Sequence, residues 1–481
     1  MSVKSNNKNN FYEIFRKFVV EYLLKLIGES SINEEDIISN NNGEENFKYV
    51  SYNQKDKILS LGINDMKLME VKLHYEISDD DLRLIRNILP KFYKIAKYNL
   101  NGKSNNRYIS KTNERINYEY ALQAGICNWI VGDSDKYSKL ENLLNILEKW
   151  SMKTYEGKNV SYGIVVNLEN KDEDLNNEFG TFLDFLQDEF SAVLTDSITS
   201  VFEINTNCKL LGYKTIIDEN CTGKVDGYDL KNNIPFRFAN VITKLVDDKK
   251  IGIFLLGNGD IILSKNQQIK FVKRNMKWLN FNIKSFRNAI KEFVDENNVN
   301  DTLLQEIYST ALDVSFAHTG GIISLITNNK IVDANNDLDI VNKCDFISSN
   351  HTDDEIKKYL SDKNSKLDNT LRICKKELQA EIKKRILKRS MIRLMLNGNY
   401  KFTKISRKLR SELVSLDGAC IIGLKGDVYS FGAIIQNDSW SSGGGRGAAA
   451  KKLSAYGMAI KISTDGYIEV YLNQQKIYTI K

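Results

Sequence analysis

The spacing of apolar residues predicts helices in the first third of the chain. Residues 11–27 place apolar side chains among five charged residues, which is typical of an amphipathic helix and too charged for a membrane span. The acidic, asparagine-rich segment 28–48 is expected to form a loop or linker.

Two later segments carry stronger helical signals. Ser78, with Asp81 three residues later, matches a helix-capping box. The apolar residues that follow recur at helical spacing up to Pro90, which is expected to end or kink this helix. A second amphipathic helix is predicted over residues 134–150, where four leucines share one face: Leu140, Leu143, Leu144 and Leu147.

The middle of the chain predicts strands. Residues 162–168 form a short apolar run, and residues 201–206 alternate in part. Residues 251–263 predict a hairpin, because two apolar runs flank Asn258-Gly259, which suits a type I′ turn. Residues 151–282 are therefore expected to form an α+β domain. No catalytic constellation stands out there, which favours a structural or sensing module.

Helical spacing returns from residue 282 to residue 316, with a break near Asn297. His318-Thr319-Gly320-Gly321 then marks a sharp transition into an apolar strand over residues 322–326. A long, charged helical stretch is predicted over about residues 353–396.

Four short strands are predicted in the last part of the chain. Residues 416–422 and 428–435 are apolar and are joined by a turn at Lys425-Gly426-Asp427. Residues 458–463 and 467–472 predict a closing hairpin through Thr464-Asp465-Gly466.

A glycine run between these two pairs suggests phosphate binding. Gly443, Gly444 and Gly445 precede Arg446 and an alanine-rich helix start. Glycines allow a close approach of the backbone, and the free N–H groups of a helix N-terminus favour a phosphate. Arg446 is placed where a guanidinium could bind two phosphate oxygens.

Taken singly, each of these features is more often structural. A glycine run before a helix is usually a turn, as is Asp417-Gly418 before a strand, and Thr319-Gly320-Gly321 is typical of a helix C-cap. His318 is more often a structural histidine, and Cys420, inside a buried strand, is more often a core residue. The functional inference therefore depends on the order and spacing of the motifs.

Composition places the chain among soluble globular proteins. It has 481 residues, of which 42% are hydrophobic and 27% charged, which suits about two to four domains. Six cysteines and three histidines are scattered, without CxxC spacing, so zinc-finger and thioredoxin-type sites are not expected. The polar first ten residues lack the apolar core of a signal peptide. A cytoplasmic protein with reduced thiols is expected.

The net charge of +6 is unevenly distributed. Residues 375–410, Lys375 to Arg410, contain thirteen Lys or Arg and two Glu, so the rest of the chain is net negative. Such a segment can neutralise the phosphates of DNA or RNA, although a charge-rich helix is more often a solvated face. Nucleic-acid binding through this segment therefore stays open as an alternative function.

The order of three motifs resembles the catalytic domain of the diadenylate cyclase family. Thr319-Gly320-Gly321-Ile322-Ile323 is similar to the family's Thr-Gly-Ala-Leu-Ile strand, and Asp417-Gly418-Ala419 reproduces its Asp-Gly-Ala motif. Gly444-Gly445-Arg446-Gly447-Ala448-Ala449-Ala450 aligns with Gly-Thr-Arg-His-Arg-Ala-Ala, and Ser454 follows in register. The resemblance covers roughly residues 283–345 and 400–481, about 140 residues.

The chain departs from the family in its third motif. Arg446-Gly447-Ala448 stands where the family has Arg-His-Arg, Gly445 replaces a threonine, and Ala455 replaces an acidic residue. Lys451 and Lys452 lie near enough in the sequence to supply replacement charge. A nucleotide-binding sensor without catalytic activity is therefore a second alternative.

The resemblance implies a fold and a domain plan. The expected class is α/β and α+β, with a mixed, twisted sheet flanked by helices in the C-terminal domain. That domain would span residues 283–481, with a basic helical insertion at about 345–400. It would follow a mainly helical region over residues 1–150 and a sensor-like α+β domain over residues 151–282.

The resemblance also implies an activity, metal-dependent condensation of NTPs, ATP in the first instance, into a cyclic dinucleotide with release of pyrophosphate. In the family, two catalytic domains face each other, so at least a transient homo-oligomer is expected, and no membrane partner. Asp417 and Arg446 would be the catalytic residues, and Asp417 would hold Mg²⁺ or Mn²⁺. The residues expected to contact nucleotide are Thr319, Gly320, Gly321, Gly418, Ala419, Gly444, Gly445, Arg446 and Ser454. The long front region suggests a regulated signal generator, by analogy with bacterial stress or phage-defence signalling.

Overall fold

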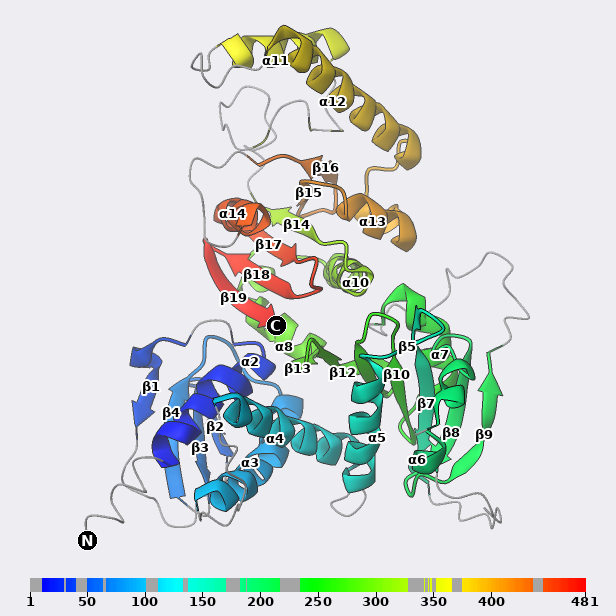
Figure 1. Ribbon diagram of the computed structural model, residues 1–481. Coiled ribbons are helices and arrows are strands. Elements are labelled where there is room, and N and C mark those ends of the chain that lie inside the picture. The colour runs from blue at the N-terminus through cyan, green and yellow to red at the C-terminus, as the bar shows by residue number, and fades with distance from the viewer. Residues whose placement is uncertain are drawn as a thin grey trace. The chain divides into compact units, whose positions relative to one another are not determined.

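The computed structural model of the chain, shown in Figure 1, divides into two compact units. The first comprises Met1–Ile290 with Ile480–Lys481, and the second comprises Lys291–Thr479. The residues that the structure describes are 11–29, 32–39, 50–63, 66–100, 111–132, 137–169, 182–186, 188–216, 234–327, 341, 345, 347, 352–365, 374–435 and 444–481.

The first unit begins with a helical segment and a small antiparallel sheet. Residues 11–18 are helical and continue into η1 (Val19–Leu23) and α2 (Leu24–Leu26). The four strands have the order β1-β4-β3-β2. They are β1 (Ile37–Ser39), β2 (Val50–Asn53), β3 (Ile58–Ile63) and β4 (Met66–Lys72), and η2 (Glu34–Asp36) precedes β1. The expectation of a loop over residues 28–48 is wrong at β1, because Ile37 and its neighbours pair with β4. Residues 40–48 lie outside the described ranges.

Three helices follow: α3 (Asp79–Leu100), α4 (Lys111–Val131) and α5 (Tyr137–Trp150). The capping box at the start of α3 is confirmed, because Ser78 Oγ lies 3.2 Å from the backbone N of Asp81 and donates to Asp81 Oδ2 at 2.8 Å. Pro90 does not end α3, which continues to Leu100. The four leucines of α5 are buried as predicted.

A seven-stranded sheet forms the rest of the first unit, in the order β13-β12-β11-β10-β7-β8-β9. β7 and β8 are parallel, and the other neighbours are antiparallel. Its strands are β7 (Tyr162–Asn167), β8 (Ser200–Asn205), β9 (Leu210–Thr215), β10 (Lys250–Leu255), β11 (Ile261–Lys265), β12 (Gln268–Arg274) and β13 (Lys277–Asn280). Shorter elements accompany it, namely β5 (Thr154–Tyr155), β6 (Lys158–Asn159), α6 (Phe182–Phe185), η3 (Glu189–Val193), η5 (Phe236–Phe238), α7 (Ala239–Leu245) and α8 (Ile283–Ala289).

The predicted β10–β11 hairpin is confirmed, but its turn type is not. Of the pair Asn258-Gly259, only Gly259 has a positive φ, +87°, and its N–H donates to Leu256 O at 2.8 Å. A type I′ turn requires positive φ at both central residues. The Oδ1 of Asn258 instead accepts a hydrogen bond from the backbone N of Asp260. The connection between β10 and β11 is therefore longer than two residues, and Gly259 provides its left-handed position.

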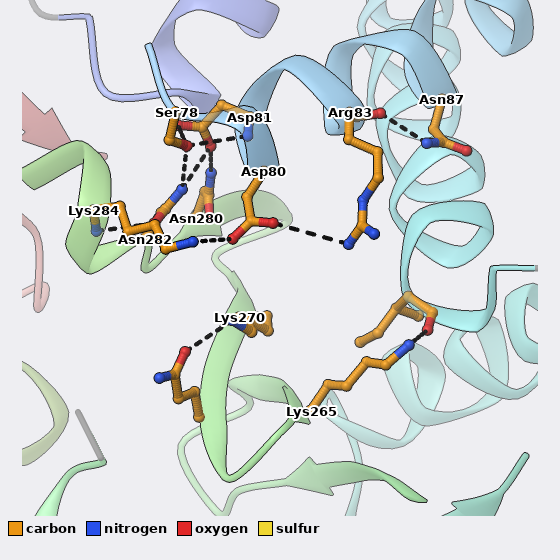
Figure 2. Close-up of polar contacts among 12 residues, drawn as sticks. Ser78, Asp80, Asp81, Arg83, Asn87, Lys265, Lys270, Asn280, Asn282 and Lys284 are labelled. Atoms are coloured by element: carbon orange, nitrogen blue, oxygen red, sulfur yellow. Dashed lines mark hydrogen bonds and ion pairs between the residues drawn. The ribbon is translucent and has the colours of Figure 1, made fainter. Parts of the chain in front are cut away.

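One hydrophobic core joins the two domains expected over residues 1–150 and 151–282. It contains residues from the first helix, α3, α5 and the large sheet, for example Phe15, Ile85, Leu147, Ile253 and Trp278. A buried polar network adds to it, as Figure 2 shows: the side chains of Asn280 and Asn282 donate to Asp81 Oδ1 at 2.8 and 3.1 Å. The expected boundary at residue 150 therefore does not divide the core.

The second unit is built on a six-stranded mixed sheet of order β16-β15-β14-β17-β18-β19. β14 and β15 run parallel, and β17 is antiparallel to β14. Its strands are β14 (Gly321–Ile326), β15 (Ala419–Gly423), β16 (Val428–Ala433), β17 (Gly457–Ile462), β18 (Ile468–Leu472) and β19 (Gln475–Ile480). Its helices are α9 (Lys291–Glu296), α10 (Asp301–Ala317), α11 (Asp353–Ser365), α12 (Lys375–Leu396), η8 (Phe402–Lys404), α13 (Arg407–Val414), α14 (Gly444–Leu453) and η9 (Ser454–Tyr456). The mixed α/β architecture agrees with the expected class.

The basic segment 375–410 is only partly a solvated face. Its arginines form internal contacts: Arg407 binds Asp313 at 2.7 Å, and Arg385 binds Asp345 at 3.1 Å. Arg410 is buried against Glu306. The exposed cations are mainly lysines, at positions 375, 376, 383, 384, 401, 404 and 408. Within the described ranges, no helix combines the length and apolar character needed to cross a membrane.

Candidate functional site

The three motifs meet at one edge of the six-stranded sheet. Because β14 and β15 are parallel neighbours, their first residues, Gly321 and Ala419, lie at the same edge. β17 is antiparallel to β14, and its last residue, Ile462, pairs with Gly321 there. α14 packs against β14 and β17 (Figure 1), and its first turn reaches this edge through Arg446.

Arg446 lies directly over Gly320. A Cβ atom built on Gly320 would stand 2.7 Å from Arg446 Nη1 and 3.1 Å from its Cζ. The φ of Gly320 is +73°, so glycine suits both the left-handed backbone and the space that the guanidinium occupies. Arg446 is half-buried and makes no hydrogen bond or ion pair with another described residue.

The N-terminus of α14 beside Arg446 is open. Gly444 and Gly445 are exposed, and a Cβ built on either would meet no atom of a described residue within 4 Å. The first N–H groups of a helix have no partner within the helix, and the helix dipole makes such an end favourable for an anion. Gly443, the first glycine of the run, lies outside the described residues.

The loop before β15 places a carboxylate at the same edge. Asp417 is exposed, and no hydrogen bond or ion pair joins its side chain to another described residue. Two residues earlier, Ser415 Oγ lies 2.7 Å from Thr319 Oγ1, which ties this loop to the start of β14. The backbone at Asp417 therefore lies at the same edge of the sheet as Thr319, Gly320 and Arg446.

Two glycines fix the backbone next to Asp417. Gly418 has a φ of +109°, and a Cβ there would stand 2.4 Å from the carbonyl carbon of Gly432. Gly432 has a φ of +69°, and a Cβ there would stand 2.9 Å from Asp417 O. The small size of Gly418 is therefore required by the close packing of the β15 and β16 backbones.

Sequence reasoning missed Lys388, which helix α12 brings to this turn. Its Nζ donates a hydrogen bond to Gly432 O. Burial lowers the pKa of Lys388, and the nearby carboxylates of Asp345 and Asp417 oppose that shift. A partly desolvated cation is therefore held beside the Asp417-Gly418 turn. Among thirteen cations in one segment, no sequence signal singles it out.

Asp345 holds α12 in place at this edge. Its carboxylate accepts from Arg385 Nη1 at 3.1 Å and from the backbone N of Ile434 at 3.1 Å. Burial raises the pKa of Asp345, while the charge of Arg385 opposes the shift. The carboxylate thus links the insertion to β16, the strand that carries Gly432.

Three of the residues expected to contact nucleotide face the interior. Ala419 is fully buried in the core between the sheet and α14. Ser454 is also fully buried, and its hydroxyl donates to Lys451 O and accepts from the backbone N of Gln474. A Cβ on Gly321 would stand 2.6 Å from Val414 O, so this glycine allows α13 to pack. The side chains of Ala419 and Ser454 therefore lie in the interior of the unit.

The lost basic residues of the third motif are not replaced by Lys451 and Lys452. Both fall in the last turn of α14, at the opposite end from Arg446. Lys461 of β17 is nearer to the motif, because its Nζ lies 3.8 Å from where a Cβ on Gly447 would stand. However, Lys461 is bound to Glu469 at 2.7 Å, so its charge is neutralised.

Two other candidates have structural roles. His318 is the left-handed C-cap of α10, with a φ of +55°, and its Nδ1 lies 3.2 Å from Thr464 O. Cys420 is fully buried, and burial raises the pKa of its thiol. The thiol of Cys420 is therefore shielded from solvent in the core.

The donor set at this edge suits a metal that arrives with a nucleotide. Within the described ranges, no three His, Cys, Asp or Glu side chains lie close enough together to hold an ion. Mg²⁺ is commonly bound by one or two carboxylates together with substrate phosphates. The exposed carboxylate of Asp417, which has no partner among the described residues, fits that kind of shared coordination.

The chain matches no model of a known protein family, no curated protein and no solved structure. The chemistry of the site therefore follows from its own groups. Arg446 and the first N–H groups of α14 can bind phosphate oxygens, Asp417 can bind a divalent cation, and Lys388 adds positive charge beside it.

Proposed function

We propose that the second unit is a diadenylate-cyclase-like nucleotidyltransferase, which condenses NTPs, ATP first among them, into a cyclic dinucleotide. One observation carries the proposal: Thr319-Gly320, Asp417 and Arg446, which are far apart in the sequence, meet at one edge of one sheet. These are the positions that the resemblance assigns to nucleotide and metal. The front unit then acts as the regulatory part of the chain.

The reaction is a pair of phosphoryl transfers. Each 3′-hydroxyl loses its proton and forms a bond to the α-phosphorus of the other nucleotide. The bond from that phosphorus to the bridging oxygen breaks, and pyrophosphate leaves. Such transfers depend mainly on positioning and on neutralisation of charge. Because one site holds one nucleotide, two copies of the unit must face each other.

The side chains have distinct tasks in this proposal. Arg446 and the N-terminus of α14 hold the triphosphate, and Gly320 leaves room for the guanidinium. Asp417 holds Mg²⁺ or Mn²⁺, which when bound lowers the pKa of a nearby hydroxyl and offsets phosphoryl charge. Lys388 supplies a second positive charge at the Asp417 turn. This charge partly compensates for Gly447 and Ala448, which stand where the family has two basic residues in the third motif.

Mass spectrometry of the reaction products tests the proposal. The full chain is incubated with ATP, GTP, CTP and UTP in Mg²⁺ and in Mn²⁺, beside Asp417→Asn. Asp427→Asn is the matched control, because the Asp427 side chain is 42% exposed and pairs with Lys401 at 2.7 Å. We expect a cyclic dinucleotide from the wild type and the control, and at least about a hundredfold less from Asp417→Asn. Equal synthesis by Asp417→Asn would refute the assignment.

The second candidate is a nucleotide-binding sensor without catalytic activity. It is favoured by Gly447 and Ala448, which leave Arg446 as the one basic residue of its motif. Calorimetric titration with an ATP analogue that has a methylene bridge between the α- and β-phosphates separates the two. Binding that Arg446→Gln abolishes, with no product from natural NTPs, would favour the sensor.

A further inference from the structure

The second unit contains a groove that the proposed nucleotide chemistry does not use. Helices α11 and α12 pack against each other (Figure 1), and the groove between them encloses about 700 Å³ and is open to solvent. Its α11 wall carries Asp353, Lys357 and Ser361, and its α12 wall carries Ile382, Ile386 and Leu387. Positions four residues apart share one face of a helix, so the groove runs along both helices. A length of at least about 12 Å suits a helix as the occupant.

Helix α12 is apolar on two faces. One face is buried through Ile382, Ile392 and Leu396. The other face carries large apolar side chains that are 46–72% exposed, namely Leu387, Met391, Leu394 and Met395. Leu387 also lines the groove, so the groove and this apolar stripe form one surface. A helix that is apolar all round is normally buried, and a contiguous exposed apolar patch marks an interaction site.

The pair of helices has a small core of its own. Leu360 and Ile382 are its buried members, with Leu378 and Ile386 packed against them. Helices in proteins gain most of their stability from the packing of an apolar face against another element. Ile382 and Ile386 belong both to this core and to the wall of the groove. A further helix laid in the groove would therefore extend the core.

The surface around the groove is positive. α11 and α12 together contain eleven Lys or Arg and six Asp or Glu, which gives a net charge of +5. Lys383 and Lys384 are exposed and make no hydrogen bond or ion pair with another described residue. Lys357 differs, because it pairs with Asp354 at 2.8 Å, and Asp353 adds a carboxylate to the lining. The two α12 lysines are therefore available to the carboxylates of a partner.

These features distinguish between possible occupants. A second copy of the helix pair would add another net charge of +5, and like charges repel at short range. DNA or RNA would match the charge, but its phosphates would lie against large apolar side chains and gain nothing from them. A helix with an apolar face and acidic flanks matches the shape of the groove, its apolar wall and its charge.

We propose that the groove and the apolar stripe of α12 bind an amphipathic helix of a partner protein, with Asp and Glu beside its apolar face. Leu387, Met391 and Leu394 recur at helical spacing, so apolar residues at similar spacing on the partner can pack between them. Methionine adapts its shape to an apolar neighbour. The partner's carboxylates meet Lys383 and Lys384 at the rim.

Fluorescence anisotropy of the full chain with labelled peptides tests this surface. The probe is a peptide of about eighteen residues, or five helical turns, with leucines at i, i+4, i+7 and i+11 and with Glu and Ala elsewhere. A second peptide has the same leucines and has Lys in place of every Glu. We expect the glutamate peptide to bind at least about tenfold more tightly at low salt, and the difference to shrink as salt is added.

Substitutions of exposed residues locate the bound peptide. Leu387→Ser should weaken binding of the glutamate peptide at least about tenfold, because it removes an apolar contact. Met391→Ser should also weaken it, whereas Met152→Ser, at a methionine of the first unit that is 71% exposed, should not. Lys383→Gln should weaken binding about two- to fivefold. Lys209→Gln, at an exposed lysine of the first unit, should leave it unchanged.

A variant of the nucleotide site and a test of other occupants complete the experiment. Arg446→Gln should bind the glutamate peptide as the wild type does, and loss of binding would place the peptide at the nucleotide site instead. Absent binding, equal binding of the lysine peptide, or binding unaffected by both Leu387→Ser and Met391→Ser would overturn the proposal. Self-association in sedimentation velocity, or binding of duplex DNA, that replaces peptide binding and is abolished by Leu387→Ser would assign the surface to a second copy or to nucleic acid.

Discussion

Nη1 of Arg446 lies 2.7 Å from the point that a β-carbon on Gly320 would occupy. The contact joins the start of β14 to the first turn of α14, two segments that meet only in the folded unit. It also makes the position of the guanidinium sensitive to a single methyl group, because a side chain on Gly320 and the present place of Arg446 are mutually exclusive.

Gly320→Ala should therefore reduce nucleotide affinity about tenfold or more, by displacing the group that binds phosphate. The left-handed backbone alone adds a destabilisation of about 1 kcal/mol. Gly398→Ala controls for that strain, because Gly398 has a φ of +78° and no atom within 4 Å of its Cβ position. Calorimetric titration with the methylene-bridged ATP analogue measures both. Equal loss of affinity in the two variants would show that strain, and not Arg446, is responsible.

Lys388→Met should lower product formation about tenfold or more while the unit stays folded, since methionine keeps most of the buried stem. Lys384→Met, at an exposed lysine one turn earlier on α12, should have little effect. Burial lowers the pKa of Lys388, so this lysine loses its charge at a lower pH than a free lysine does. As the pH is raised, the activity that depends on this charge should therefore begin to decline before a free lysine would titrate. An unchanged rate and pH profile in Lys388→Met would assign this lysine to packing alone.

Glu306→Gln should destabilise the second unit by about 3–5 kcal/mol, because it leaves the guanidinium of Arg410 buried without a counter-charge. The two side chains are 6% and 2% exposed. Asp427→Asn breaks the surface pair with Lys401 and should change stability by no more than about 1 kcal/mol. Urea denaturation followed by circular dichroism compares them. If both variants lower stability only slightly, the hydrogen bond from Arg410 Nη1 to Phe402 O is enough to stabilise the buried guanidinium without Glu306.

Glu141→Gln should stabilise the first unit above neutral pH. Burial raises the pKa of Glu141 to about 7, from an ordinary value of 4.5, and its Oε1 has no partner within the described ranges. The folded state therefore retains this proton more strongly than the unfolded state, and stability is lost as pH rises from 4.5 through 7. The advantage of glutamine should reach about 2–3 kcal/mol above pH 7.

That advantage should disappear below about pH 4.5, where both states hold the proton. Thermal unfolding across this pH range measures it. Glu156→Gln, at an exposed residue of the same unit, should give the wild-type curve at every pH. A constant difference between Glu141→Gln and the wild type at all pH values would contradict the ionisation argument.

Local signals in the sequence predicted local structure well. The Ser78 capping box and the leucine face of α5 depend on residues three or four apart, and both are present. β9 was missed because its side chains are mostly exposed and do not alternate. β19 was also missed, since its hairpin turn uses Asn473-Gln474, both with positive φ, instead of a glycine.

The sequence predicted residues of the candidate site only where those residues belong to a recognisable motif. The motif order brought Thr319, Asp417 and Arg446 into one hypothesis, and the structure places them at one edge. The facing pair Gly418 and Gly432 could not be foreseen, because the need for glycine arises from the contact between two strands. Lys388 was equally hidden, since its position depends on the buried Asp345, 43 residues earlier in the chain.

The central place of β14 has a consequence during synthesis of the chain. All six of its residues are buried, and its two neighbours, β15 and β17, both follow it in sequence. Roughly 90 residues separate the end of β14 from the start of β15, which at 5–20 residues per second means about 5–20 s on the ribosome with both strand edges unpaired. Open strand edges are templates for wrong pairing. Any chain that stops before residue 457 lacks β17 and keeps one of these edges open. We therefore expect nascent and truncated forms of this protein to need chaperones more than the finished chain does.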